Sequence, residues 1–214
     1  MDYPFVNLHT HHPETSGLCV LNLPRDAAFP PGKNRWYCYG IHPWWAGNTE
    51  HEMSILEDLL QKNLIAAIGE TGLDKNYPSL PEQLQVFERQ IALSENFQKP
   101  MILHNVKGTG EILQLHKKNA PRQAWVIHGF NGTQEEAKQL TDRGIYLSVG
   151  NSLLYGNRKI TQTLPSIPWD YLFFETDEAM IPVEEVYEKA SQLLSVPMEA
   201  LKEKIFANFA RIIY

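Results

Sequence analysis

Eight short apolar runs recur along the chain, and they constrain its fold more than any other feature. Several are continuously apolar rather than alternating, which is typical of parallel strands covered on both faces. The sequence therefore predicts an α/β protein with eight strands. They are expected at residues 4–8, 18–23, 36–41, 65–70, 100–104, 124–128, 145–149 and 171–175.

Helical patterns lie between the later runs. Pro81 stands at a favoured first helical position, and Thr133 with Glu136 forms a capping-box pattern before a helix that Gly144 can end. Strands alternating with helices predict a TIM-type (β/α)8 barrel, with an open doubly wound sheet as the alternative. The expected helices cover 50–62, 81–97, 133–144, 183–194 and 198–207.

The first two connections between strands are too short for full helices. A parallel crossover normally needs about a dozen residues, and residues 24–35 are rich in proline. We therefore expect a trimmed barrel whose first one or two outer helices are missing or reduced. With no low-complexity tract or linker in its 214 residues, the chain is expected to form a single domain over 1–214.

Composition restricts the partners and the compartment. The net charge of −6 gives no sign of the broadly basic surface of a nonspecific nucleic-acid binder, so any contact with nucleic acid would be local. Cys19 and Cys38 are the only cysteines and are expected to be reduced and buried. Without a signal peptide or an apolar run near the roughly 20 residues that span a bilayer, we expect a cytoplasmic protein away from membranes. Nothing points to a protein partner.

Imidazole and carboxylate groups follow most of the apolar runs. Alone, each has an ordinary reading as a hydrogen-bonded histidine or a cap. In a barrel, however, the carboxyl ends of the strands form one face, where catalytic groups gather. Burying such groups together is costly without compensation, which a divalent cation supplies. The groups are His9, His11, His42, Glu70, His104, His128 and Asp177.

Histidine and carboxylate ligands without thiolates suit zinc, manganese, iron or magnesium. One cation could be held by His9, His11 and Asp177. A second could be held by His104 and His128, with Glu70 between the two. Paired cations can activate water and bind the oxygens of a displacement.

The same residues, in the same order, resemble the TatD family of metal-dependent deoxyribonucleases, a branch of the amidohydrolase-like barrel superfamily. The resemblance runs from residue 4 to 214 and includes a closing N-F-A-R at 208–211. Its motifs are H-x-H at 9–11, G-x-H-P at 40–43, G-E-x-G-L-D at 69–74, K-P-x-x-x-H at 99–104, H-x-F-x-G at 128–132 and E-T-D at 175–177.

The resemblance implies hydrolysis of phosphodiester bonds, typically in DNA, with two divalent ions such as zinc, magnesium or manganese. It implies that Asp177 also activates the attacking water and that His42 lies beside the scissile phosphate without binding metal. The implied ligands are His9, His11, Glu70 and Asp177 for one ion, and Glu70, His104 and His128 for the other.

Three positions bear on the substrate. The family usually has Asp where this chain has Asn7, which shares a strand face with His9 and His11 and is expected to tune the metals from one layer deeper. Val106 replaces a family arginine, and Lys107 could substitute as a point charge. Trp44 could stack on bases, as in single-strand binders, or pack as a lid.

Two alternatives to a deoxyribonuclease stay open. The first keeps the metals and changes the substrate to a small phosphoester, lactone or amide, because the arginine is lost and the chain is acidic. The second is a noncatalytic metal-binding barrel.

Overall fold

The computed structural model describes residues 3–12, 17–29, 34–47 and 49–214. The strands are β1 Val6–Thr10, β2 Leu18–Asn22, β3 Arg35–Tyr39, β4 Ala67–Asp74, β5 Met101–Val106, β6 Trp125–Ile127, β7 Tyr146–Val149 and β8 Leu172–Phe174. Each of the eight predicted runs overlaps one strand, so the prediction of eight strands is confirmed, although β1, β3, β4 and β5 extend beyond the predicted bounds.

Seven α-helices and four short 3-10 helices accompany these strands in the described part of the chain. The capping box is present, because the Thr133 hydroxyl accepts from the Glu136 backbone and Glu136 accepts from the Thr133 N–H. The α-helices are α1 Glu50–Gln61, α2 Leu80–Phe97, α3 Thr109–Asn119, α4 Gln134–Thr141, α5 Arg158–Thr163, α6 Val183–Leu194 and α7 Met198–Ile213. The 3-10 helices are η1 Pro43–Trp45, η2 Asn151–Leu153, η3 Leu164–Ser166 and η4 Trp169–Tyr171.

The early connections lack helices in the part of the chain that the structure describes. No helix lies between β1 and β2 or between β2 and β3 there, as the short spacing predicts. Residues 13–16 and 30–33 of these connections lie outside the described residues.

The chain forms two compact units, and we describe each by itself. The first comprises residues 1–21, 30–36 and 127–214, and the second comprises 22–29 and 37–126. The prediction of a single domain stays a prediction.

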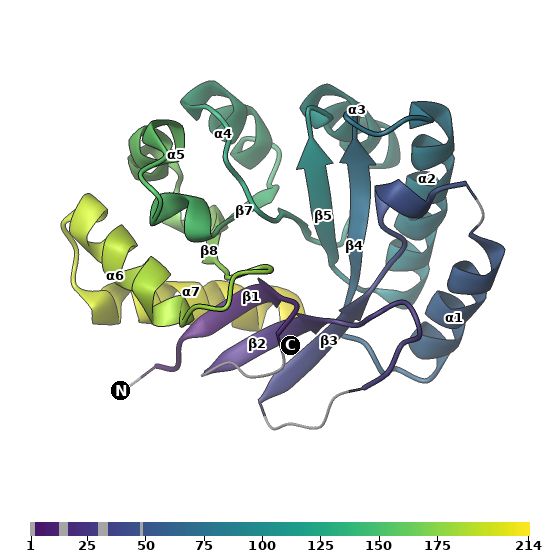
Figure 1. Ribbon diagram of the computed structural model, residues 1–214, viewed down its shortest axis with the longest axis horizontal. Coiled ribbons are helices and arrows are strands. Elements are labelled where there is room, and N and C mark those ends of the chain that lie inside the picture. Colours follow the sequence, from purple (N-terminus) through teal and green to yellow (C-terminus); the bar gives the residue numbers. More distant parts are fainter. Residues whose placement is uncertain (1–2, 13–16, 30–33, 48) are drawn as a thin grey trace. The chain divides into compact units, whose positions relative to one another are not determined.

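In the first unit, parallel pairing and one long helix hold together segments from both ends of the chain. β1 pairs in parallel with β2, and β7 with β8. Beyond the strand ends, Thr10 forms an isolated parallel bridge with Asp177. α7 packs on both β1 and β8 (Figure 1). These contacts bring the residues after β1 next to the residues after β8.

In the second unit, β4 pairs in parallel with β3 and with β5, and α2 packs on β4 (Figure 1). Gln90 of α2 is fully buried and fixes two site segments. Its amide donates to the Ile41 carbonyl and the Thr71 hydroxyl and accepts from the Ile41 N–H. The residues beside His42 and Glu70 are therefore fastened to the same side chain.

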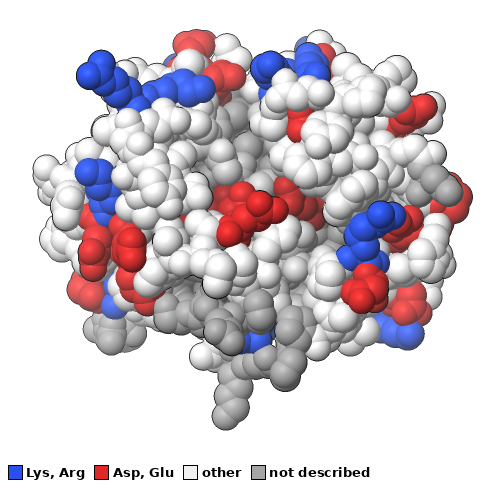
Figure 2. All heavy atoms as spheres, in the orientation of Figure 1, with Lys and Arg blue, Asp and Glu red and all other residues white. Residues whose placement is uncertain are grey.

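The described surface carries mixed charge. On the face in Figure 2, Lys and Arg side chains lie scattered among Asp and Glu, in agreement with the expectation from the net charge. Cys19 and Cys38 are both buried, as predicted. Of the described helices, none combines the length and the apolar character needed to cross a membrane.

Candidate metal centre

The first unit brings together His9, His11 and Asp177, the set predicted to hold one cation. One Asp177 oxygen, Oδ1, lies 3.5 Å from His9 Nε2 and 3.6 Å from His11 Nε2. His9 is fully buried, whereas the His11 and Asp177 side chains are 32% and 37% exposed. The group can therefore be reached from solvent through two of its three members.

Main-chain hydrogen bonds place these three side chains. The Asp177 N–H donates to the His9 carbonyl at 3.0 Å, and the His11 N–H donates to the Asp177 carbonyl at 3.1 Å. Asp177 has a φ of 53°, in the left-handed region that Asp adopts more readily than most residues. The turn after β8 thus continues the pairing with β1 up to the predicted ligands.

Asn7 lies fully buried below this group, on β1. Its Oδ1 accepts from the Thr176 N–H at 3.0 Å, and its Nδ2 donates to the Thr176 hydroxyl at 2.8 Å. The Thr176 hydroxyl in turn donates to Thr10 Oγ1 at 3.2 Å. Asn7 therefore contacts the residue that immediately precedes Asp177, while its predicted effect on the metals stays a prediction.

His128 also belongs to the first unit. Its ring centroid lies 4.4 Å from that of His9, and its Nδ1 lies 3.5 Å from Glu175 Oε1. Glu175 is fully buried and accepts from the Gly129 N–H at 2.5 Å. Sequence reasoning did not assign a role to Glu175, although its place in the E-T-D motif is a signal that could have found it. The predicted position of His128 beside His104 and Glu70 stays a prediction.

The second unit brings together His42, Glu70 and His104. Glu70 Oε1 lies 2.8 Å from His104 Nδ1 and 3.3 Å from His42 Nε2. His42 and Glu70 are buried and His104 is partly buried. The Glu70 N–H donates to Asn22 Oδ1 at 3.1 Å, which anchors the backbone of β4 at this residue. The sequence predicted the Glu70–His104 neighbourhood.

The Asp74 carboxylate contacts the His104 ring of this second group and the indole of Trp44. Its Oδ2 accepts from the Trp44 indole N–H at 2.8 Å and lies 3.4 Å from His104 Nε2, while its Oδ1 accepts from the Asn76 N–H. Burial raises the pKa of the Asp74 carboxyl, but the hydrogen bonds from Trp44, Asn76 and His104 outweigh it and leave the pKa below its usual value. An ionised Asp74 therefore fixes the His104 ring, as carboxylates do behind metal-binding histidines.

The Lys107 side chain, a predicted substrate contact, is exposed. Lys107 follows β5, and its Nζ donates to Asn76 Oδ1 at 2.8 Å. Its role as a substitute for the family arginine stays a prediction.

The donor chemistry of both groups fits a divalent cation. Each consists of imidazole nitrogens and a carboxylate, with ligand atoms within 4.8 Å of one another and no thiolate. Catalytic metal sites commonly have three protein ligands and keep a further position open. Each group offers three candidate ligand atoms, if His42 is counted in the second.

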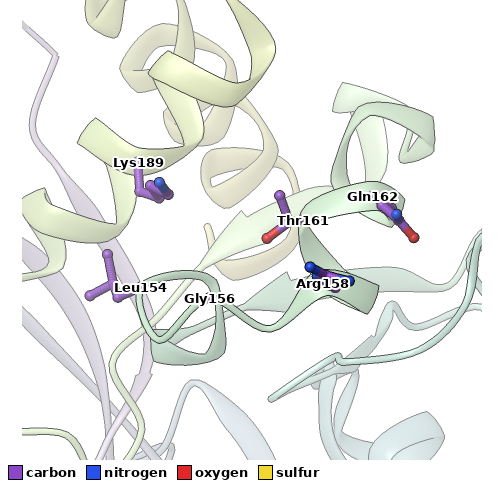
Figure 3. Close-up of a pocket in the computed structure, with 6 residues that line it drawn as sticks. All are labelled: Leu154, Gly156, Arg158, Thr161, Gln162 and Lys189. Atoms are coloured by element: carbon purple, nitrogen blue, oxygen red, sulfur yellow. The ribbon is translucent and has the colours of Figure 1, made fainter.

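A separate pocket of about 350 Å³ opens in the first unit between α6 and the η2–α5 segment (Figure 3). Two cationic side chains, Arg158 and Lys189, line it together with Leu154, Gly156, Thr161 and Gln162. None of the predicted ligands is among these residues, so the pocket is distinct from the candidate metal centre.

Solved structures of known proteins share this fold. A TatD homologue from Escherichia coli K12, YJJV, superposes with a TM-score of 0.88 over 100% of this chain and 99% of that chain, at 19% identity. A TatD-family hydrolase from Entamoeba histolytica gives a TM-score of 0.79 over 100% and 99%, at 17% identity. The fold is therefore the predicted TIM-type (β/α)8 barrel. A barrel that carries such histidine–carboxylate groups can support metal-dependent hydrolysis.

Sequence comparison identifies the family. The family described as TatD related DNase matches residues 31–214, so the chain belongs to the TatD family. An uncharacterized metal-dependent hydrolase from Haemophilus influenzae is 28% identical over 209 residues, 87% of this chain and 79% of that protein. The 3'-5' ssDNA/RNA exonuclease TatD from Edwardsiella piscicida is 31% identical over 148 residues, 66% of this chain but 57% of that protein.

Proposed function

We propose that the chain hydrolyses phosphodiester bonds in single-stranded nucleic acid, with DNA as the first substrate, and that it uses two divalent cations. The observation that carries the proposal is the presence of a histidine–carboxylate group in each compact unit of a TatD-family chain. A relative named for single-stranded DNA and RNA supports this substrate class.

The proposed ligands follow the family pattern. His9, His11 and Asp177 would hold one ion, His104 and His128 the other, and Glu70 would serve both. Bound divalent cations would make water a stronger nucleophile at neutral pH and offset the charge that develops on the phosphoryl oxygens. Zinc, magnesium and manganese all suit these donors.

Asp177 is the proposed general base. Its side chain is partly exposed, so water and substrate can reach it, while the main-chain bonds to His9 and His11 hold its position. A carboxylate that accepts a proton from the attacking water must lie within hydrogen-bond reach of it. Asp177 meets the access requirement better than the buried Glu70 does.

His42 is proposed to donate a hydrogen bond rather than to bind metal. Its Nδ1 accepts from the Trp44 backbone N–H at 3.2 Å, so in the neutral ring the proton resides on Nε2. That Nε2–H faces Glu70 Oε1 at 3.3 Å, and a substrate oxygen would accept it in place of this carboxylate. This tautomer supports the family role beside the scissile phosphate.

The proposal is tested with metal-replete protein on a substrate panel. Single-stranded oligodeoxynucleotides, generic phosphodiesters, and small carboxylic esters, lactones and amides would be compared under identical conditions. Preferential cleavage of oligonucleotides is expected. Strong turnover of a small ester beside inert oligonucleotides would overturn the nuclease assignment, and metal-loaded protein that cleaves no substrate of the panel would favour the noncatalytic alternative.

A further inference from the structure

Two large exposed aromatic side chains stack on each other beside the second ligand group. The rings of Trp44 and Tyr77 lie 4.7 Å apart between centroids with an interplanar angle of 19°. Trp44 is 46% exposed and Tyr77 is 42% exposed. We call this pair the aromatic platform. The pair exposes flat aromatic surface to solvent. Hydrating this apolar surface is less favourable than hydrating polar side chains would be.

Hydrogen bonds lock the platform to the ligand group. The Trp44 indole N–H donates to Asp74 Oδ2, the oxygen that lies 3.4 Å from His104 Nε2. The Tyr77 N–H donates to the Asp74 carbonyl at 3.1 Å, so the same residue fixes both members of the pair. A platform held this way loses little conformational freedom when a ligand binds to it.

The platform also contacts the predicted reaction centre directly. The Trp44 ring meets the His42 ring edge-on, with centroids 4.5 Å apart, and its centroid lies 6.1 Å from that of His104. A base stacked on the pair would therefore lie close to His42, the residue proposed to face the phosphate.

We propose that Trp44 and Tyr77 stack an unpaired nucleobase of the substrate next to the scissile phosphodiester. This inference rests on the function proposed above and names the part of the substrate that the site recognises. Bases in a duplex are already stacked on their neighbours, whereas those of a single strand are available to aromatic side chains. The platform thus selects single-stranded over double-stranded nucleic acid.

The charge around the platform favours a neutral planar ligand. Asp74 lies directly behind the indole and Glu70 lies within the adjoining group. A phosphate alone would gain nothing from an aromatic face. A nucleobase is planar and uncharged, and all four bases can stack on an aromatic side chain.

The test distinguishes stacking of a base on the Tyr77 ring from simple apolar packing against the Tyr77 side chain. Tyr77→Leu keeps an apolar side chain and removes the ring, whereas Tyr77→Phe keeps the ring. Phe29→Leu is the matched control, because Phe29 is 41% exposed and its ring pairs with Tyr37 rather than with the platform. Each variant would be titrated with a fluorescently labelled oligothymidylate and with an abasic strand of equal length, with divalent ions chelated to prevent cleavage.

Tyr77→Leu is expected to weaken oligothymidylate binding by about tenfold and to leave abasic-strand binding unchanged. Tyr77→Phe and Phe29→Leu should bind both strands as the wild type does. Equal affinity of the wild type for both strands, no binding of either, or equal weakening of both by Tyr77→Leu would overturn the platform.

The result of this binding test can be told apart from the result of the cleavage test of the proposed function. Preference for thymine-bearing strands without any metal-supported cleavage would support the platform and contradict the nuclease. Cleavage of oligonucleotides without that preference would support the nuclease and overturn the platform.

Discussion

Asn7 contacts Thr176 through both of its polar atoms, accepting from the backbone N–H and donating to the hydroxyl. Both residues are buried, with 0% and 1% exposure, so neither bond can be replaced by water without a rearrangement. An amide makes this pair of bonds possible, because one of its atoms accepts while the other donates. A carboxylate could only accept from both groups.

The Asn7→Ala variant is expected to unfold more easily than the wild type. It leaves the buried Thr176 N–H without its acceptor, which typically costs about 1 to 3 kcal/mol. The free energy of unfolding in urea measures the loss. Thr176→Ser keeps both the N–H and the hydroxyl and should lose less than half as much, so an equal loss in the two variants would contradict this account.

Glu70→Gln is expected to reduce metal-dependent turnover by roughly 100-fold or more, beyond the effect typical of groups behind the ligands. The amide preserves the shape but removes the charge that two imidazoles face within 3.3 Å. Turnover on the best substrate of the panel gives the readout, and the metal-free variant should retain the wild-type circular dichroism spectrum. Glu88→Gln, at an exposed pair with Lys118, is the control and should leave turnover unaltered. Wild-type turnover in Glu70→Gln would exclude the proposed ligand role.

Divalent cations are expected to stabilise the protein against heat and urea. An ion that binds only the folded state adds about 2.7 kcal/mol at 100 times its dissociation constant. His11→Ala should diminish this increment because His11 lies 3.6 Å from Asp177 Oδ1. His12 instead contacts the Glu178 carbonyl through its Nε2, at 2.9 Å. His12→Ala should therefore keep the full increment, and an equal decrease in both variants would argue against a site at His11.

Tyr39 is expected to make stability fall at alkaline pH. Burial, reinforced by the Glu52 carboxylate, raises the pKa of the Tyr39 hydroxyl to about 12, while an unfolded tyrosine ionises near 10. The contribution is complete below about pH 10 and is lost as the pH rises towards 12, because only the unfolded chain releases its proton in that window. The total is about 2 to 3 kcal/mol.

Urea unfolding of wild type and Tyr39→Phe at about pH 9.5 and about pH 11.5 isolates this effect from the other tyrosines. The variant also loses the hydrogen bond to the Arg25 carbonyl, so it should be less stable at the lower pH. The advantage of the wild type should decline at the higher pH. A constant difference between the two proteins would show that Tyr39 titrates normally.

The sequence predicted the strands well because each is a compact apolar run. It did not predict α3, which buries only Ile112 and Leu115 among its 11 residues, so its helical repeat is faint. It also did not predict α5, whose six residues are too few to show a period. Both helices form because the tertiary structure offers a surface for their few apolar side chains.

The site was predictable where chemistry follows strand ends and unpredictable where it depends on side-chain pairing. The groups of His9 and of Glu70 were found because strand ends share a face in barrels. Asn7 and Thr176 lie 169 positions apart, and no local pattern encodes which atoms of such a pair meet. The stacking of Trp44 on Tyr77 depends likewise on η1 and the turn after β4, which meet only in the folded chain.

The reciprocal bonds between Asp177 and the backbone of β1 involve only N–H and C=O groups, which substitution of ordinary side chains does not remove. The spacing between His9, His11 and Asp177 therefore depends on main-chain geometry rather than on the side chains around the turn. Substitutions around this turn are expected to change the chemical groups that the site offers without moving the main chain that presents them.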